Sequence, residues 1–374
     1  MAIAKVEARL LEGTPQDGVV FGIGAFNTYS MVLVEVTDDE GRTGYGEAIA
    51  RRGGSMTAEA VRALLAPVLI GADESNIEGL WGEMVEQLRR WGHTSGVVME
   101  AISGVDVALW DLAGQRAGLP VWRLLAGAGR STVPVYASSV YIADRETMIR
   151  EALEQKARGF DRIKIKIGRS PEKGGEREDL ATLRELRAAV GDETTLVVDA
   201  NGAYDAATAI KVARAMEEVD IRWFEEPLPA DDLKGYERLH AMTSTPLARG
   251  ETDFGFWTMQ EVIERRLVDV VQPDLARCGG ITGARHVWTL ANAANLAFAP
   301  HTGFSGGLSQ LAALHVAAAA PRLLSLEYMF IDNPTREIFV GGYPKPDHGT
   351  LAAPTAPGLG LQLDYTLVEK LTVA

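Results

Sequence analysis

The amino-acid sequence predicts an α/β fold in which a small α+β module precedes a barrel of parallel strands. Two observations lead to this prediction. Up to about residue 127, a β-hairpin pattern is followed by helical periodicity, whereas beyond it short apolar runs alternate eight times with segments of helical length. Eight alternating strand–helix units are typical of a parallel barrel, whose active site lies at the C-terminal ends of the strands.

Residues 1–50 have the pattern of antiparallel β-structure. Val32, Val34 and Val36 recur at every second position, with polar Glu35 and Thr37 next to the last two. The run Asp38-Asp39-Glu40-Gly41 supplies a turn, and the chain returns through 43–47. The alternation predicts a hairpin with one face toward solvent.

A glycine-rich loop is expected at 13–28. It holds four glycines and one proline together with apolar residues that include Phe21, Ile23 and Phe26. This composition fits a mobile loop that closes over a substrate, with these three side chains in contact with it. An ordinary exposed loop fits the composition equally well.

Residues 57–117 change to helical spacing and predict three helices, the last of which ends at Gly118, just before a proline. Asp106 and Asp111 lie in the last helix. Buried helix aspartates more often bond backbone amides or an arginine than take part in chemistry, so we expect structural roles for both.

Beyond residue 127, the first predicted helix begins after the capping residue Asp144 and ends at Gly159. The eight predicted barrel strands are 133–137, 162–167, 195–199, 221–224, 246–250, 268–271, 296–299 and 324–326. We divide the chain into an α+β module (1–127), a barrel (128–345) and a C-terminal segment (346–374). Because this last segment is long and ends on an apolar stretch, we expect it to dock on the first module.

Composition excludes several classes of protein. The formal net charge is −14, which disfavours nucleic acid and anionic membrane as partners. Cys278 is the only cysteine, which excludes an intrachain disulfide and the usual structural zinc clusters, and we expect its thiol to be buried and inert. The sequence shows no signal peptide and no membrane span, so a cytoplasmic location is expected.

Three predicted strands in succession end on an acid. Asp199, Glu225 and Glu251 are spaced 26 residues apart, and in a barrel their carboxylates converge on one side of the mouth. Three oxygen ligands without Cys or His suit a hard divalent cation such as Mg²⁺. The alternative is that acids end these strands by chance or cap the following helices. Glu226 is also available, and the sequence does not separate it from Glu225.

The second predicted strand places Lys164 and Lys166 on the same face, because successive side chains of a strand point to opposite faces. Two lysines that point into a barrel must meet an anion. Their mutual repulsion should lower the pKa of at least one, and a neutral lysine is a competent general base. The alternative is an edge strand that shows both lysines to solvent.

Two further strand ends carry Asp274 and His301. If they are neighbours, Asp274 can hold one imidazole nitrogen and direct the other into the mouth as a second acid or base. Glu327 follows the eighth strand and is expected to bond a bound carboxylate in its acid form, or else to cap a helix. Asn201 could orient a substrate hydroxyl or a ligand. The other histidines show no partner pattern.

These residues, taken together, resemble the enolase superfamily and within it the mandelate racemase subgroup. The resemblance extends over nearly the whole chain. Its motifs are Thr43-Gly44-Tyr45-Gly46-Glu47, Ala108-Leu109-Trp110-Asp111-Leu112, Lys164-x-Lys166, Val198-Asp199-Ala200-Asn201, Glu225-Glu226-Pro227, Gly250-Glu251, Gln272-Pro273-Asp274 and Pro300-His301. The muconate-lactonising subgroup has a lysine where this chain has Asp274, which speaks against that subgroup.

The resemblance implies a modified TIM barrel, (β/α)7β-like, with an N-terminal capping domain completed by the C-terminal segment. It implies Mg²⁺, or Mn²⁺ in its place, on Asp199, Glu225 and Glu251. Lys166 and the His301–Asp274 pair would then act as acid and base, while Lys164 and Glu327 stabilise the substrate carboxylate. A homo-oligomer, dimer or octamer, is also implied.

The implied chemistry is removal of the proton next to a carboxylate, with Mg²⁺ stabilising the enediolate that forms. We expect dehydration of an acid sugar to a 2-keto-3-deoxy acid. The apolar loop at 13–28 favours the alternative, racemisation or epimerisation of a 2-hydroxy acid. A cycloisomerase and a non-catalytic protein that binds sugar acids are weaker alternatives.

Overall fold

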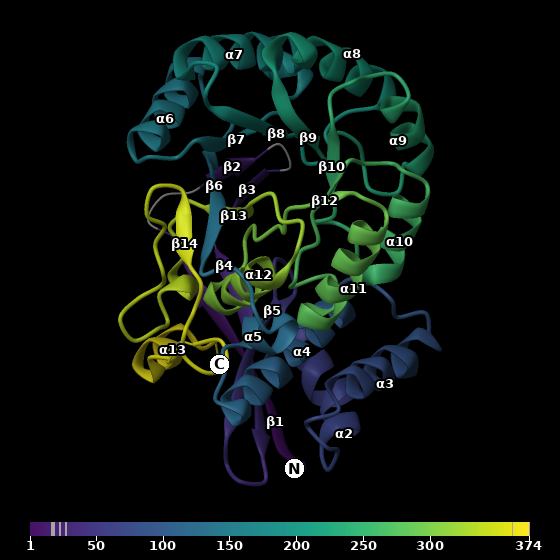
Figure 1. Ribbon diagram of the computed structural model, residues 1–374, viewed down its shortest axis with the longest axis vertical. Coiled ribbons are helices and arrows are strands. Elements are labelled where there is room, and N and C mark those ends of the chain that lie inside the picture. The colour runs from purple at the N-terminus through teal and green to yellow at the C-terminus, as the bar shows by residue number, and fades with distance from the viewer. Residues whose placement is uncertain (16–18, 22–23, 27, 361, 374) are drawn as a thin grey trace.

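The computed structural model describes residues 1–15, 19–21, 24–26, 28–360 and 362–373 (Figure 1), with the backbone alone for 19–21 and 24–26. The N-terminal module is built on an antiparallel sheet of order β1 (Ile3–Gly13), β4 (Tyr29–Asp38) and β5 (Thr43–Ile49). The predicted hairpin is confirmed, because β4 pairs with β5 across the expected turn. A separate small hairpin, β2 (Val19–Phe21) with β3 (Gly24–Phe26), comes from the glycine-rich segment.

The prediction of a solvent-facing side on this hairpin is wrong. β4 is the central strand, and even Glu35 is only 5% exposed. One side of the sheet packs on α4 (Val97–Ala117), so closely that a Cβ at Gly44 or Gly46 would overlap the α4 backbone. On Glu35, the hydroxyl of Tyr365 from α13 (Tyr365–Leu371) donates a hydrogen bond of 2.7 Å. The alternation in the sequence could not show this cover, because it comes from the far end of the chain.

The helical part of the module differs from prediction in its first helix. In place of one helix the structure has α1 (Gly54–Glu59), a π-helical turn η1 (Ala60–Leu65) and α2 (Ala66–Leu69). Pro67 stands at the start of α2, where its missing N–H is tolerated. Then come α3 (Ile77–Arg89), α4 and α5 (Val121–Ala126), with α4 ending at Gly118, whose φ of +66° a glycine adopts readily.

The barrel prediction is confirmed. Eight parallel strands follow one another in chain order, and the first also pairs with the last. A bridge between Phe298 and Leu323 joins the remaining gap. The strands are β6 (Thr132–Val140), β7 (Arg162–Lys166), β8 (Thr195–Asp199), β9 (Ile221–Glu225), β10 (Leu247–Arg249), β11 (Val270–Val271), β12 (Ala297–Phe298) and β13 (Leu326–Met329). The last four are short, and β13 begins two residues later than predicted.

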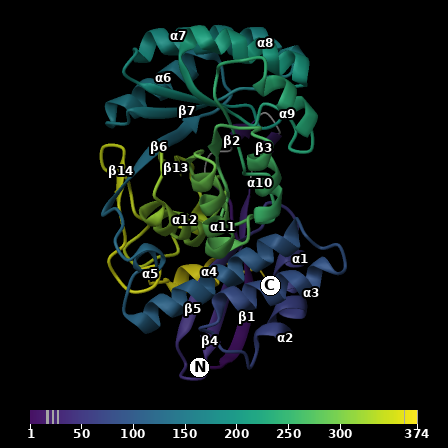
Figure 2. The same ribbon diagram turned by 45° about the vertical axis from the view of Figure 1, so that its right-hand side comes forward.

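Helices fill the connections between the barrel strands (Figure 2). They are α6 (Arg145–Ala157), α7 (Gly175–Val190), α8 (Ala206–Met216), α9 (Leu233–His240), α10 (Gly255–Glu264), α11 (Gly280–Ala293) and α12 (Gly307–Ala319), with single 3-10 turns η2 (Pro171–Lys173) and η3 (Glu217–Val219). Asp144 caps α6 by accepting a bond from the amide of Thr147, as predicted. After β13 comes only the 3-10 turn η4 (Pro334–Arg336) and then β14 (Thr350–Ala352), which pairs with β6.

Side chains rather than a pore fill the lower barrel. One buried cluster takes a residue from the inward face of most strands, with Tyr136 and Trp223 in edge-to-face contact at 5.6 Å. Strands alternate faces, so residues two positions further along also point inward, at the C-terminal mouth. In this way Asp199, two residues beyond Val197, and Glu225, two residues beyond Trp223, are directed to the mouth.

Three buried carboxylates of the module accept hydrogen bonds from backbone amides of other segments. Glu47 accepts from the start of α12, Asp106 from the start of α11, and Asp111 from Leu359 of the C-terminal segment. Burial raises the pKa of Glu47 and Asp106 to about 7 and that of Asp111 to about 6. The structural roles expected for Asp106 and Asp111 are those the structure gives them, and Glu47 has the same role.

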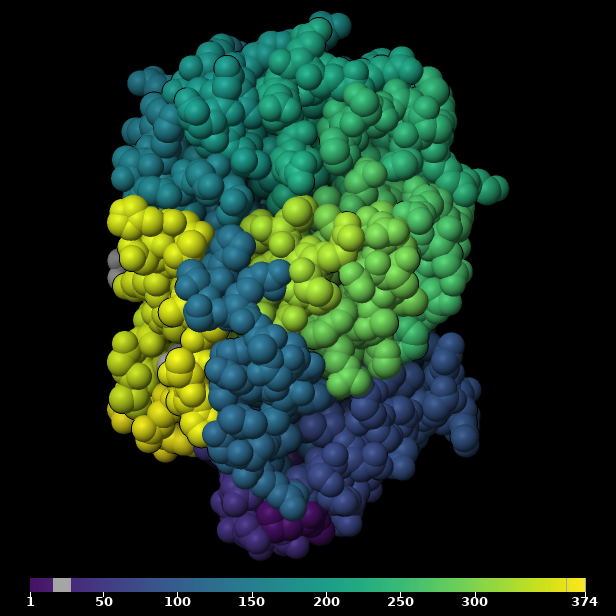
Figure 3. Space-filling view, in the orientation of Figure 1, coloured from purple at the N-terminus to yellow at the C-terminus, as the bar shows by residue number. Residues whose placement is uncertain are grey.

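The C-terminal segment lies along one side of the molecule and reaches the N-terminal sheet (yellow in Figure 3). The amide of Val373 donates to the carbonyl of Leu10 at 2.9 Å, and Leu11 forms a bridge with Thr372. Of the helices in the described ranges, none has both the length and the apolar character that a membrane crossing requires.

His315 joins three segments from inside α12. It is fully buried; its Nδ1 accepts from the amide of Trp122, and its Nε2 donates to the carbonyl of Leu359, both at 3.1 Å. This arrangement uses the neutral ring, and burial lowers the pKa of His315 from 6.5 to about 4. No sequence pattern indicates these two partners, because both are distant from His315 in the chain.

We predict that His315 makes the protein lose stability in acid. The imidazole of His315 takes up a proton near pH 6.5 in the unfolded chain and only near pH 4 in the folded chain. The stabilisation that the buried neutral ring contributes is therefore present above pH 6.5 and is lost as the pH falls from 6.5 to 4. The loss amounts to about 3 kcal/mol in the free energy of unfolding. Denaturant unfolding at pH 7.5 and 4.5 should show a flatter pH dependence for His315→Gln than for the wild type. The exposed His93→Gln is the control, and equal pH dependence in all three proteins would contradict the prediction.

Candidate active site

The predicted polar residues converge at the C-terminal mouth of the barrel. Lys164 and Lys166 come from β7, Asp199 from β8 and Glu225 from β9. Glu251, Asp274 and His301 follow β10, β11 and β12, and Glu327 lies within β13 rather than after the last strand as predicted. All of them are buried, with relative exposures of 6% or less. Buried charges of both signs in one place are stable only when they are paired.

Lys164 lies among three carboxylates. Its Nζ is 2.5 Å from Glu225 Oε1, 3.0 Å from Asp199 Oδ2 and 3.1 Å from Glu327 Oε1. Burial by itself would lower the pKa of this ammonium group, but the three carboxylates outweigh it and raise the pKa well above its usual value. Lys164 is therefore a fixed positive charge.

The predicted effect of lysine–lysine repulsion is not seen for Lys164. Lys166 Nζ also forms an ion pair with Asp199, so the carboxylate of Asp199 lies between the two ammonium groups. Attraction to this carboxylate offsets their repulsion. The two lysines on the inward face of β7 therefore lie next to anions, as expected for lysines that point into a barrel.

His301 is held from both sides. Its Nδ1 is 2.8 Å from Asp274 Oδ2, and its Nε2 forms an ion pair with Glu251 and lies 3.4 Å from Glu327 Oε2. Burial lowers the pKa of His301, but Glu251 and Glu327 outweigh it and raise the pKa to about 10. With Asp274 on Nδ1, Nε2 is the nitrogen that faces the mouth.

The expectation that Glu327 acts in its acid form is not supported. Although burial favours the neutral carboxyl, Lys164 and His301 hold the pKa of Glu327 far below its usual range. Its Oε2 also accepts a bond of 2.9 Å from the amide of Thr302. Glu327 is an ionised carboxylate here, because the cations Lys164 and His301 lie beside it. The sequence could not show this, since both cations come from strands that are distant in the chain.

The chemistry of the predicted cation ligands fits a hard divalent ion. Asp199, Glu225 and Glu251 offer only oxygen atoms as ligands. Burial, together with the negative charge of Asp199, raises the pKa of Glu225 to about 7. Asn201 Nδ2 donates to Glu251 Oε1 at 3.0 Å, while Asn201 Oδ1 is buried without a hydrogen-bond partner. Across the described residues, no three acids, histidines or cysteines are arranged ready to hold a metal, since Lys166 and His301 occupy two of these carboxylates.

Glu226 is placed apart from Glu225. Its Oε1 accepts from the hydroxyl of Thr252 at 2.6 Å, and its backbone has a φ of +34°. Burial and Glu251 raise the pKa of Glu226 to about 8. The carboxyl that the sequence could not distinguish from Glu225 therefore points toward the loop after β10 and away from Lys164.

Sequence reasoning missed two groups at the mouth. Arg51, just after β5, donates to the carbonyl of Gly303 at 3.1 Å and lies 3.5 Å from Asp274 Oδ2. Ser138 ends the inward face of β6, beside Lys164 in the register, and its Oγ is buried without a hydrogen-bond partner. Strand alternation could have indicated Ser138, whereas nothing in the sequence brings Arg51 to the barrel.

Three residues of the glycine-rich loop, Phe21, Ile23 and Phe26, are predicted to contact substrate. Ile23 lies outside the described residues, and for Phe21 and Phe26 only the backbone is described. Figures 1 and 2 both show β2 and β3 at the level of the barrel strands and away from the cap sheet. The described apolar residues near the mouth are Tyr29, Ile49, Ala276, Phe304 and Met329, which form one buried cluster.

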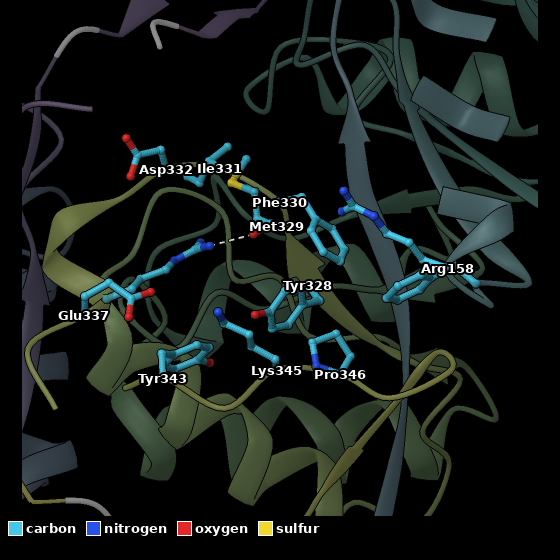
Figure 4. Close-up of a pocket in the computed structure, with 12 residues that line it drawn as sticks. Arg158, Tyr328, Met329, Phe330, Ile331, Asp332, Glu337, Tyr343, Lys345 and Pro346 are labelled. Atoms are coloured by element: carbon cyan, nitrogen blue, oxygen red, sulfur yellow. Dashed lines mark hydrogen bonds between the residues drawn. The ribbon is translucent and has the colours of Figure 1, made fainter. Parts of the chain in front are cut away.

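A cavity of about 610 Å³ lies beside β13 and holds none of the predicted residues (Figure 4). Tyr328 and Phe330 line the cavity, whereas Glu327, which precedes Tyr328 in β13, points into the barrel toward Lys164. Its other lining side chains include Arg158, Lys345 and Tyr343. The cavity is thus separate from the ion-pair cluster of the mouth.

A capped parallel barrel whose mouth gathers acids, two lysines and an Asp-supported histidine defines a class of enzyme that moves protons. Comparison with known families agrees with this class. A family model described as "Mandelate racemase / muconate lactonizing enzyme, N-terminal domain" matches residues 5–126, and one described as "Enolase C-terminal domain-like" matches residues 147–367. The chain belongs to the mandelate racemase/muconate lactonizing enzyme family of the enolase superfamily.

Known relatives differ in the reaction for which they are named. Arabinonate dehydratase of Saccharolobus solfataricus is 33% identical over 91% of this chain and 90% of its own, and D-galactarolactone cycloisomerase of Agrobacterium fabrum is 31% identical over 97% of both chains. A racemase from Streptomyces coelicolor A3(2), whose crystal structure contains magnesium, has a TM-score of 0.90 at 30% identity, covering 99% of this chain and 100% of its own.

We predict that Lys164→Met lowers the free energy of unfolding by about 3 kcal/mol or more at neutral pH, because it leaves buried carboxylates without their counter-charge. This loss of stability should become smaller toward pH 5, where protonation of the buried carboxylates removes their uncompensated charge. Denaturant titration at both pH values measures it. Lys173→Met, an exposed lysine, should change stability by less than about 0.5 kcal/mol. A Lys164→Met protein as stable as this control would contradict the charge balance.

Proposed function

We propose that this enzyme removes the proton next to the carboxylate of an acid sugar and expels the β-hydroxyl, giving a 2-keto-3-deoxy acid. One observation carries the proposal: a single mouth holds two separate proton-transfer groups. Lys166 on β7 pairs with Asp199 on β8, and His301, after β12, pairs with Asp274, after β11. Between them stand β13 and β6 on one side of the ring and β8 to β11 on the other.

The residues divide the work by their charge and position. Lys164 is a fixed cation that holds the substrate carboxylate and stabilises negative charge as it develops on it. Lys166 takes the α-proton as the neutral amine, after it has lost to solvent the proton of its ion pair with Asp199. Nε2 of His301 gives a proton to the leaving hydroxyl, since Asp274 fixes Nδ1 and leaves Nε2 toward the mouth. Arg51 and Asn201 are placed to contact the substrate from the cap and from β8.

Asp199, Glu225 and Glu251 are the residues that would hold Mg²⁺. When bound there, Mg²⁺ supplies Lewis-acid stabilisation of the enediolate charge. The oxygen-only donor set of these three residues and the magnesium in the racemase structure support this assignment. Because Lys166 and His301 pair with two of these carboxylates, a cation must compete with both ion pairs.

Two other reactions use the same first step. Returning a proton on the opposite face would racemise or epimerise a 2-hydroxy acid, and ring opening would make the enzyme a cycloisomerase. The names of the relatives support each of these alternatives. The presence of two proton-transfer groups in one mouth does not by itself distinguish these reactions. A catalytically inactive sugar-acid-binding protein is disfavoured, because every residue of the implied set is present.

We predict that Mg²⁺ stabilises the folded protein through these carboxylates. At a concentration about 100 times its Kd, a ligand specific for the folded state adds about 2.7 kcal/mol to the free energy of unfolding. Asp199→Asn and Glu251→Gln should lose this gain, while Glu146→Gln, an exposed acid on α6, should retain it. Thermal unfolding with Mg²⁺ or with a chelator measures the effect. An equal gain in all variants would place the cation elsewhere.

We predict that the enzyme, incubated with Mg²⁺ and a library of aldonic and aldaric acids, forms a 2-keto acid. Lys166→Ala and His301→Asn should each lower the rate by about 100-fold or more, the contribution typical of a positioned acid or base. Lys173→Ala is the matched control. Full activity in either site variant would remove that residue from the mechanism. If no 2-keto acid forms but a 2-hydroxy acid exchanges its α-hydrogen with D₂O, the enzyme is a racemase or epimerase.

A further inference from the structure

A buried carboxylate outside the mouth ties together the loops that follow three neighbouring strands. Asp179, in α7, is fully buried and accepts four hydrogen bonds. Its Oδ2 accepts from the amides of Gly168 and Arg169, both at 3.0 Å, and from the hydroxyl of Tyr204 at 2.7 Å. Its Oδ1 accepts from the guanidinium of Arg169 at 2.6 Å.

The four donors come from loops at the mouth. Gly168 and Arg169 belong to the loop after β7, two and three residues beyond Lys166, and Tyr204 belongs to the loop after β8, beyond Asp199. The guanidinium of Arg169 also donates to the carbonyl of Ala143, in the loop after β6, at 2.7 Å. The carboxylate of Asp179 thus joins the loops after β7 and β8, and the guanidinium of Arg169 that it holds extends this connection to the loop after β6.

The loop after β7 has little room to move. Gly168 has a φ of +100°, and a Cβ there would lie 2.7 Å from the Cβ of Ala203 and 3.0 Å from the carbonyl oxygen of Ala200. The amide of Ile167 donates to the carbonyl of Asp199 at 2.9 Å. The position of Lys166 relative to Asp199 therefore depends on how these two loops are held.

We propose that Asp179, braced by Tyr204 and Arg169, is a positioning residue for Lys166 and not for His301. The four hydrogen bonds lie on the β6–β8 side of the mouth. His301 has its own support, because Asp274 on the neighbouring strand end holds its Nδ1. The two proton-transfer groups thus have separate supports, and one can be loosened without the other. This inference rests on the two-sided function proposed above.

The variants are Tyr204→Phe and Asp179→Asn. Tyr204→Phe removes one of the four donors and keeps the ring, so it is the milder change. Asp179→Asn replaces one acceptor oxygen with an NH₂ group, which must face either the donors at Oδ2 or the Arg169 guanidinium. The matched control is Tyr236→Phe in α9, which also removes a buried hydroxyl, one that donates to the carbonyl of Leu228 at 3.0 Å.

The first measurement is hydrogen–deuterium exchange by mass spectrometry and needs no turnover. In both Tyr204→Phe and Asp179→Asn, amides in the peptide containing 167–170 should exchange at least about tenfold faster than in the wild type. The peptide containing His301 should not change. Tyr236→Phe should leave both peptides unchanged. If the 167–170 peptide keeps its protection in Asp179→Asn, the brace does not hold this loop and the proposal is overturned.

The second measurement follows α-hydrogen exchange in D₂O on the two faces of the substrate carbon, using a pair of 2-epimeric acids. The face lost in Lys166→Ala is assigned to Lys166, and the face lost in His301→Asn to His301. We expect about tenfold slower exchange on the Lys166 face for Tyr204→Phe and up to about 100-fold for Asp179→Asn. The His301 face should stay within about twofold.

A purely structural role would slow both faces alike, and that result overturns the proposal, as does unchanged exchange on both faces. If the wild type neither forms a 2-keto acid nor exchanges an α-hydrogen in any acid, the proposed function fails. The amide-exchange measurement then still decides whether Asp179 holds the loop that carries Lys166.

Discussion

The pairing of buried charge at the barrel mouth is the interaction on which the rest of this structure depends. Two lysines and a histidine sit among carboxylates with almost no exposure to water. Each charge is stable there only because its partners come from neighbouring strands at the same height, and the parallel register supplies that arrangement. The same register that closes the barrel therefore decides the protonation of the site: Lys164 stays cationic and Glu327 stays ionised.

The cap is held over this mouth by a second set of buried carboxylates. Glu47 and Asp106 accept hydrogen bonds from the first turns of α12 and α11, where the helix dipole favours negative charge. α12 starts six residues after His301, and Arg51 follows four residues after Glu47. The docking of the cap and the placement of a cation against Asp274 are thus consequences of one packed interface. A substrate bound at the mouth would meet groups from both modules.

Much of the fold could be predicted because the signals are local. Strand–helix alternation, Asp144 as a cap and Gly118 as a helix end depend on residues within a few positions of one another. The errors arose where distant segments meet. β4 is covered by Tyr365 from the other end of the chain, and the first cap helix is interrupted by a π-helical turn. Similarly, His315 has two hydrogen-bond partners that no sequence pattern indicates.

The sequence by itself determined which chemical groups stand at the strand ends, because the twofold alternation of a strand and the order of parallel strands follow from residue spacing alone. Only the tertiary structure decided which groups touch. It put Asp199 between two lysines, turned Glu226 toward Thr252 and brought Arg51 to Asp274. The physical reason is that a pKa or an ion pair depends on distances of a few ångströms between side chains that the sequence separates by up to hundreds of residues.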